Sequence, residues 1–163
     1  MPKTREELFA FLHDLGIETT TFDHPAVFTV EEAKAHRGDL PGAHCKNLFL
    51  KDKKGALFLV VAEEDRAIDM KELRHKIGAN HLSFGKPDLL MEVLGVEPGS
   101  VTVLALINDT ENRVNVVIDE AIMEADVLNC HPLVNTATTV IKTPDVIKFV
   151  QACGHEPAVR NLT

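Results

Sequence analysis

Residues 46–52 carry the side chains with the clearest chemical potential in this sequence. The ammonium of Lys46 and the carboxamide of Asn47 stand at the start of an apolar run. Placing such groups against apolar surroundings costs free energy unless they bind something. Neighbours on a strand point to opposite faces, so one of the two can enter a cleft while the other braces a loop. The alternative is a solvated strand end, where lysine is common.

Two histidines stand directly before prolines, His24 before Pro25 and His131 before Pro132. A residue before proline is pushed into an extended conformation, so each imidazole leaves a locally stiff segment. This arrangement suits a fixed polar group at the rim of a pocket. A neutral imidazole there can orient an ester or an attacking water molecule. The alternative is a histidine whose ring nitrogens are satisfied within the fold.

A third candidate is the loop Gly99-Ser100-Val101-Thr102. Glycine allows a ligand to approach the backbone closely, and backbone N–H groups can then stabilise an oxyanion. Glycine and proline also mark ordinary turns, so the pattern alone is weak.

Basic side chains form two small groups. Lys71, Arg74 and His75 have the spacing that places them on one face of a helix, where they either contact phosphates or are simply solvated. Lys51 and the pair Lys53-Lys54 surround an expected hairpin turn. No aromatic residue is interleaved with either group, and the chain has no Trp or Tyr, so base stacking is poorly supported.

A metal or thiol mechanism is disfavoured, and we expect no cofactor. The three cysteines and the scattered histidines show none of the spacings typical of zinc sites. Cys130 is next to His131 and Cys45 is next to His44, but neighbours on a strand point apart.

Capping boxes, glycine stops and apolar periodicity predict the order of the elements. We expect helices that begin at Thr4, Thr29, Asp69, Pro87 and Thr143. We also expect strands over 18–22, 45–50, 56–62, 101–107, 113–118 and 138–141, in which 45–50 with 56–62 and 101–107 with 113–118 form hairpins. Helices set between hairpins favour an α+β fold over a doubly wound parallel sheet. A chain of 163 residues fits one domain over 1–163.

Bulk properties exclude several classes of protein. A net charge of −8 opposes binding to DNA or long RNA, although a local basic patch can still contact a small part of an RNA. No apolar run approaches the roughly 18 residues of a membrane span. The charged N-terminus lacks the apolar core of a secretory signal, and three cysteines without a disulfide pattern suit a reducing compartment. We therefore expect a cytoplasmic protein.

Three segments together resemble the YbaK/ProX family of trans-editing aminoacyl-tRNA deacylases, and most of all the stand-alone relatives of the prolyl-tRNA synthetase editing domain. These segments are residues 23–33, which contain HPAVFT, residues 46–52, and residues 131–139, which contain HPL and NTATT. The resemblance implies a mixed, mostly antiparallel sheet of six or seven strands, partly closed and surrounded by helices.

The resemblance also implies roles for these residues. Lys46 would face the editing pocket and hold the substrate carbonyl or the terminal nucleotide, with Asn47 in support and His131 beside the pocket. Further substrate contacts would come from two segments: His24, Val27, Phe28 and Thr29, and the loop of Gly99, Ser100, Val101 and Thr102. That loop matches the first four positions of a GxxxP motif, but Val103 replaces the proline, which leaves the loop shape and the substrate choice open.

The implied reaction is hydrolysis of the ester between an amino acid and the 3′-terminal adenosine of tRNA, without a metal or cofactor. The expected substrate is Ala-tRNA(Pro), the expected partners are the acceptor end of mischarged tRNA and prolyl-tRNA synthetase, and Lys71, Arg74 and His75 would contact the tRNA. Two alternatives stay open. One is a deacylase of the same family for Cys-tRNA(Pro) or another mischarged tRNA, and the other is a non-catalytic module that holds tRNA ends.

Overall fold

The structure is a computed structural model that describes residues 2–25 and 42–162. The helix expected to begin at Thr29, and with it Val27, Phe28 and Thr29 as substrate contacts, lies outside the described residues.

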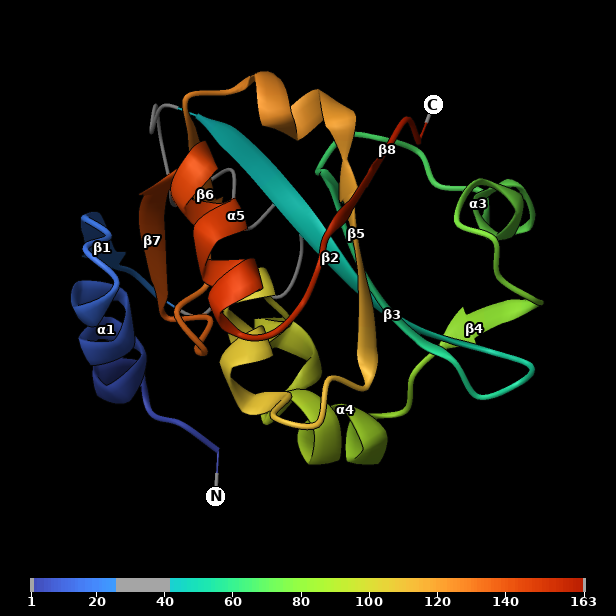
Figure 1. Cartoon of the computed structure of the whole chain (residues 1–163), viewed down its shortest axis with the longest axis horizontal. Helices are drawn as coiled ribbons and strands as arrows, with labels where there is room; N and C mark the ends of the chain where they lie inside the picture. Colours follow the sequence, from blue (N-terminus) through green and yellow to red (C-terminus); the bar gives the residue numbers. More distant parts are fainter. Residues whose placement is uncertain (1, 26–41, 163) are drawn as a thin grey trace.

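The helices and strands of the described residues alternate along the chain (Figure 1). The α-helices are α1 (Arg5–Asp14), α3 (Met70–Lys76), α4 (Pro87–Leu94) and α5 (Thr143–Ala152), and the 3-10 helices are η1 (Pro98–Ser100), η2 (Val103–Asn108) and η3 (Glu120–Glu124). The strands are β1 (Thr19–Asp23), β2 (Ala43–Asp52), β3 (Leu57–Glu63), β4 (Leu82–Phe84), β5 (Val114–Asp119), β6 (Val127–Cys130), β7 (Ala137–Lys142) and β8 (Ala158–Arg160).

Local signals set several helix boundaries as predicted. At α1 the Thr4 side chain accepts a hydrogen bond from the Glu7 backbone, and the Glu7 carboxylate accepts one from the Thr4 backbone. At α3 the Asp69 side chain accepts from the backbone of Lys71. Helix α4 ends at Gly95, whose φ of 65° suits glycine.

The described strands form one eight-stranded mixed sheet in the order β1-β7-β6-β2-β3-β5-β8, and β4 also pairs with β2. The pairs β1–β7, β2–β3, β2–β4 and β6–β7 are antiparallel, and the pairs β2–β6, β3–β5 and β5–β8 are parallel. This arrangement confirms the predicted α+β class with a mixed, mostly antiparallel sheet. The sheet has more strands than the six or seven expected, because β4, β6 and β8 were not predicted.

The hairpin expected from residues 101–107 and 113–118 is wrong. Residues 103–108 form η2, in which Val103, Leu104 and Leu106 are buried, and β5 pairs in parallel with β3 and β8. A continuous apolar run does not distinguish a strand from a buried helix.

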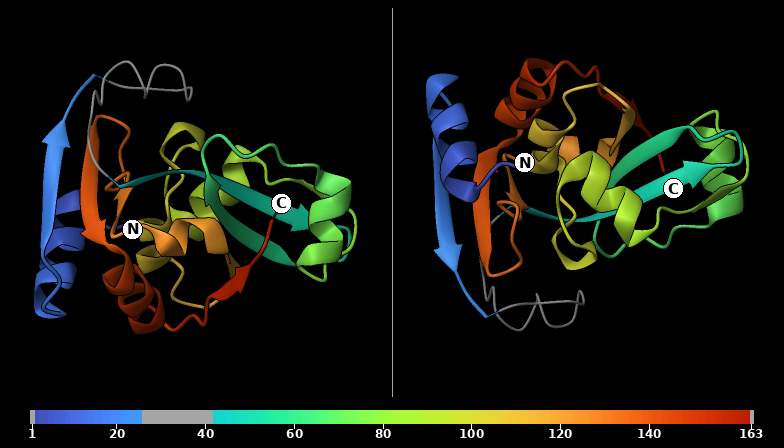
Figure 2. Two further views of the ribbon diagram at one scale, coloured as in Figure 1. Left: turned by 90° about the horizontal axis from the view of Figure 1, so that it is seen from above. Right: turned by 90° about the horizontal axis from the view of Figure 1, so that it is seen from below.

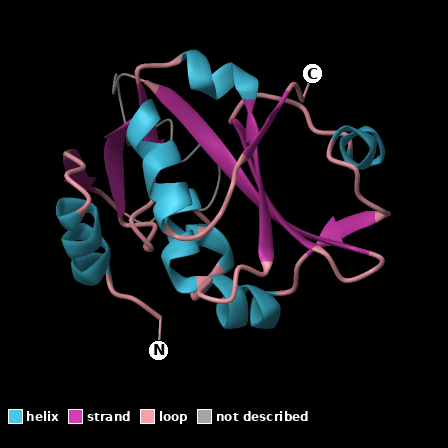
Figure 3. Ribbon diagram, in the orientation of Figure 1, coloured by secondary structure: helices cyan, strands magenta, loops and turns pink. Residues whose placement is uncertain are grey.

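Hydrophobic cores lie on both faces of the sheet, and β2 contributes to both. Its apolar odd-numbered residues, such as Phe49, pack in the larger cluster with α1, α4, η2 and α5. Its apolar even-numbered residues, Leu48 and Leu50, pack in the smaller cluster with α3. Figure 3 shows α4 and α5 together on one side of the sheet. Both views in Figure 2 place α1 and β1 at one end of the molecule and α3 at the other.

Strand β2 joins the two halves of the sheet. Ala43 and His44 pair with β6, whereas residues 50–52 pair with β4. Over residues 45–49, β3 is the one strand partner within the described chain. Gly42, with a φ of +96°, lets β2 begin close to β6, because a Cβ at this position would lie 2.6 Å from the carbonyl oxygen of Val127. Strand β2 therefore separates from β6 beside Lys46.

Candidate functional site

Strand register places Lys46 and His131 on the same side of the sheet. Strands β2 and β6 are parallel, with Ala43 opposite Leu128 and His44 opposite Asn129. Lys46 and His131 each lie two residues beyond the last of these pairs, where the two strands part. The residues before them, Cys45 and Cys130, both pack in the larger core cluster. Because successive side chains alternate, Lys46 and His131 both face away from that cluster.

The ammonium of Lys46 is held by the turn that follows β3. Its Nζ donates a hydrogen bond to the backbone carbonyl of Arg66. The Nε of Arg66 in turn donates to Oδ2 of Asp119 at 2.5 Å. Asp119 is fully buried and also accepts from the backbone of Ala121 at 3.2 Å. The Arg66–Asp119 ion pair thus fixes the carbonyl that positions Lys46.

His131 is positioned by the backbone of β7. Its Nδ1 lies 3.3 Å from the carbonyl oxygen of Ala137, and since a carbonyl only accepts, Nδ1 must carry the proton. Burial lowers the pKa of His131 below its usual range, and the nearby His24 adds to the shift. The ring is therefore neutral at pH 7, and its Nε2 presents a lone pair that can accept a proton.

His24 lies next to His131 at the same end of the sheet. Its Nδ1 is 2.8 Å from the carbonyl of Pro25, and its Nε2 is 2.8 Å from the hydroxyl of Thr138. The β6–β7 register pairs Cys130 with Thr139, which places Thr138 beside His131. The segments around residues 24 and 131, which are far apart in the sequence, therefore meet at β7, on the side of the sheet that Lys46 also faces.

Asn47 faces the opposite side of β2 from Lys46. It shares the alternation of Cys45 and Phe49, which both pack in the larger core cluster. Its Oδ1 is buried and has no hydrogen-bond partner among the described residues. An unpaired buried acceptor costs about 1–3 kcal/mol. The structure thus separates Asn47 from Lys46 and His131, and leaves it with an acceptor open to a donor.

The segment of Gly99, Ser100, Val101 and Thr102 has structural contacts of its own. Gly99 and Ser100 belong to η1, and the Thr102 hydroxyl accepts from the backbone of Leu104 at 3.2 Å, which caps η2. Val101 packs against the larger core cluster. In the part of the chain that the structure describes, no hydrogen bond joins this segment to Lys46, Asn47 or His131.

Helix α3 carries the residues predicted to contact tRNA. Lys71 and His75 are exposed and Arg74 is half-buried, while Leu73 points into the smaller core cluster. The helix face shared by Lys71, Arg74 and His75 is therefore directed away from the smaller core cluster, toward solvent.

The cysteine thiols near the site are unreactive. Burial raises the pKa of Cys45 well above its usual range and that of Cys130 to about 12. Both thiols are therefore protonated at pH 7 and are poor nucleophiles. Over residues 2–25 and 42–162, no group of three or more His, Cys, Asp or Glu side chains is placed to hold a metal ion.

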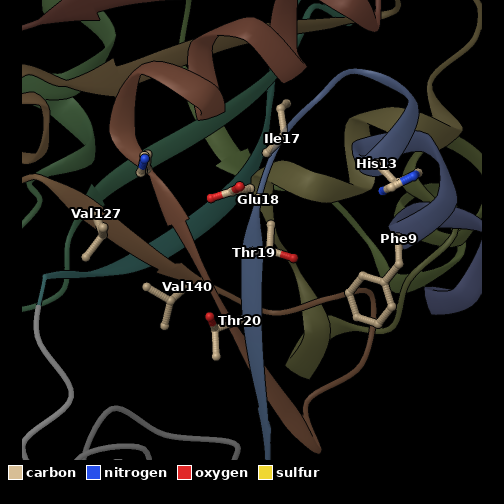
Figure 4. A pocket seen from close by; sticks show the side chains of 9 residues that line it. Phe9, His13, Ile17, Glu18, Thr19, Thr20, Val127 and Val140 are labelled. Carbon is tan, nitrogen blue, oxygen red and sulfur yellow. The ribbon is translucent and has the colours of Figure 1, made fainter.

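A separate hollow of about 630 Å³ lies between α1, β1 and β7 (Figure 4). Thr19 of β1 points toward Phe9 and His13 of α1, and Thr20 points toward Val140 of β7. None of the predicted site residues lines this hollow.

Three residues that position the site, Arg66, Asp119 and Thr138, have contacts that no local pattern in the sequence predicts. Arg66 and Asp119 are 53 positions apart in the chain, and His24 and Thr138 are 114 apart. No local pattern could have paired them.

The comparisons with known proteins agree on one family. A model of the aminoacyl-tRNA editing domain matches residues 24–149. A prolyl-tRNA synthetase associated domain-containing protein 1 from Danio rerio is 43% identical over 157 residues, covering 95% of this chain and 85% of that protein. The prolyl-tRNA editing protein ProX from Acetoanaerobium sticklandii is 36% identical over 152 residues and 93% of each chain.

A crystal structure of a proposed trans-editing enzyme for prolyl tRNA synthetase has the same fold. It superimposes with a TM-score of 0.71 at 16% identity, over 99% of both chains. The fold and the match to the editing-domain model define an aminoacyl-tRNA editing domain. The chain belongs to this family, in agreement with the resemblance seen in its motifs. None of the helices in the described part of the chain has the length and apolar character needed to cross a membrane.

Proposed function

We propose that this protein hydrolyses the ester between a wrongly attached amino acid and the 3′-terminal adenosine of tRNA, and that Ala-tRNA(Pro) is its substrate. The observation that carries the proposal is the placement of the Lys46 ammonium and the neutral His131 on one side of the sheet, where β2 leaves β6. Family membership and the names of the relatives support the same reaction. The protein would act in the cytoplasm, with prolyl-tRNA synthetase as a second partner.

The two side chains supply complementary parts of an ester hydrolysis. A lysine ammonium has three donors, and one is used on Arg66. The others can stabilise the negative charge that develops on the carbonyl oxygen. His131 Nε2 accepts a proton from water as the water oxygen bonds to the carbonyl carbon. The carbon–oxygen bond to the ribose then breaks, and the ribose oxygen takes up the proton.

Substrate choice rests on size. A synthetase site built for proline rejects the smaller alanine weakly, because a missing methylene costs only about 1–3 kcal/mol. A second, smaller pocket excludes proline, the cognate amino acid, and admits the wrongly attached alanine for hydrolysis. Val27, Phe28 and neighbouring apolar residues are proposed to set that limit, whereas the backbone from Gly99 to Thr102 is proposed to supply polar contacts to the substrate.

A panel of aminoacylated tRNAs tests the proposal. We expect Ala-tRNA(Pro) to lose its amino acid faster than Cys-tRNA(Pro), and Pro-tRNA(Pro) to decay at the rate of buffer alone. Fastest release from Cys-tRNA(Pro) or another species would instead support the alternative substrate within the family. Binding of tRNA ends without any release would identify a non-catalytic module.

The rate of deacylation should depend on pH through His131. The lowered pKa means that the neutral, proton-accepting ring is already dominant above pH 6.5, the ordinary value for histidine. The single-turnover rate should therefore change by less than about twofold between pH 6.5 and 8 and fall about tenfold per pH unit well below the pKa of His131. His131→Asn is the matched control, since its deacylation rate should no longer fall at low pH through titration of residue 131. A midpoint above 6.5, after subtraction of spontaneous ester hydrolysis, would rule out a lowered pKa in this role.

A further inference from the structure

A cationic groove of about 870 Å³ lies at the far end of β2 from Lys46. The β2–β3 hairpin contributes Lys51 and Lys53 to it, β4 and its flank contribute His81 and Phe84, and the residue before α4 contributes Lys86. All five of these residues are exposed. We call this surface, formed by Lys51, Lys53, His81, Phe84 and Lys86, the hairpin groove.

The charge of the hairpin groove is opposite to that of the whole protein. Within the described chain, none of its three lysine ammonium groups has a carboxylate partner. The buried Asp52 also lines it, but its carboxylate accepts backbone hydrogen bonds from residues 54, 56 and 80. Asp88 is the remaining carboxylate in the lining. A local excess of positive charge in a protein of net charge −8 favours an anionic ligand here.

An exposed aromatic ring lines the same groove as these ammonium groups. Phe84 is 65% exposed, more than any other large hydrophobic residue in the described chain. Pairing of β4 with β2 sets Phe84 opposite Leu50 and Ser83 opposite Lys51, so this edge of the sheet lines one groove with the ring and with lysines about 30 positions earlier in the sequence. A cationic groove with an exposed aromatic ring is how proteins bind single-stranded nucleic acid, with phosphates on the lysines and a base on the ring.

The hairpin groove and the candidate editing site share one strand. Lys46 and Lys51 are five residues apart on β2, which at about 3.3 Å per residue is roughly 17 Å, and because side chains on a strand alternate, the two project to opposite faces of β2. Figure 1 shows β2 running from β6 to the hairpin beside β4. A single ligand that contacts both places must therefore pass around the edge of the sheet at β4, which an extended polyanion can do and a small molecule cannot.

We propose that the hairpin groove binds the acceptor arm of the tRNA whose 3′ end enters the site at Lys46. Its phosphates contact Lys51, Lys53 and Lys86, and one unpaired base stacks on Phe84. This inference rests on the proposed function, because it assumes that the ester is carried by an RNA. The surface is distinct from the predicted contact at Lys71, Arg74 and His75, none of which lines the groove.

Titration of the full chain with uncharged tRNA(Pro), followed by fluorescence anisotropy at several salt concentrations, tests the inference. Phe84→Ala should weaken binding about 5- to 100-fold through lost stacking. The triple variant Lys51→Ala, Lys53→Ala, Lys86→Ala should reduce the slope of log affinity against log salt by about 2–3, since each lost phosphate contact removes somewhat less than one unit. Lys142→Ala is the matched control, because it removes one exposed lysine from β7 at the other end of the sheet and should bind like wild type.

The outcomes separate this inference from the proposed function. Unchanged affinity and salt slope in both groove variants, with thermal unfolding like that of wild type, would overturn the inference even if the protein deacylates tRNA. An equal loss in Lys142→Ala would also overturn it, since the effect would then be one of net charge. Weakened binding confined to the groove variants would support it, even in a protein that releases no amino acid.

Discussion

Replacing Lys46 with alanine should lower the single-turnover rate of Ala-tRNA(Pro) deacylation by about 100- to 1,000-fold. This is the usual loss when one donor to a developing oxyanion is removed. The half-buried ammonium is held by the carbonyl of Arg66, so its geometry is set before the substrate arrives. The measurement is release of labelled alanine from Ala-tRNA(Pro) with enzyme in excess.

Lys148→Ala is a closely matched control for this experiment. Like Lys46, Lys148 donates a hydrogen bond from Nζ to a backbone carbonyl, that of Leu15, but it lies on α5 and lines no part of the candidate site. It should therefore deacylate at the wild-type rate. An unimpaired Lys46→Ala, or an equal loss in both variants, would remove Lys46 from the mechanism.

Asp119→Ala should lower the free energy of unfolding by about 3–5 kcal/mol, the largest stability effect that we expect from removing a single charge. The change leaves the guanidinium of Arg66, which is only 16% exposed, without its carboxylate partner. It also removes an acceptor for the backbone of Ala121. Urea unfolding followed by circular dichroism measures the difference.

An exposed ion pair provides the comparison. Asp23 also pairs with an arginine, Arg5, at 3.1 Å, but its side chain is 76% exposed. Solvent screens such a pair, so Asp23→Ala should cost less than about 1 kcal/mol. Similar losses in both variants would show that burial of the Arg66–Asp119 pair is not what makes it important.

The outlines of the fold followed from short-range patterns. The capping residues Thr4 and Asp69 and the stop at Gly95 predicted helix ends correctly, because each acts on backbone groups within one turn. The hairpin of β2 and β3 was also predicted, since its turn and its strands are contiguous. The error at Val103–Asn108 arose where local information fails, in an apolar run buried on all sides.

The sequence by itself determined which residues are chemically suited to a site, Lys46, Asn47, His24 and His131, and which family the chain resembles. It did so because motifs are read over a few neighbouring positions. Only the tertiary structure decided that Lys46, His24 and His131 share one side of the sheet, that Asn47 faces the other, and that Phe84 lines the hairpin groove together with its lysines. These outcomes depend on strand register and order, which are fixed by burial of side chains far apart in the chain.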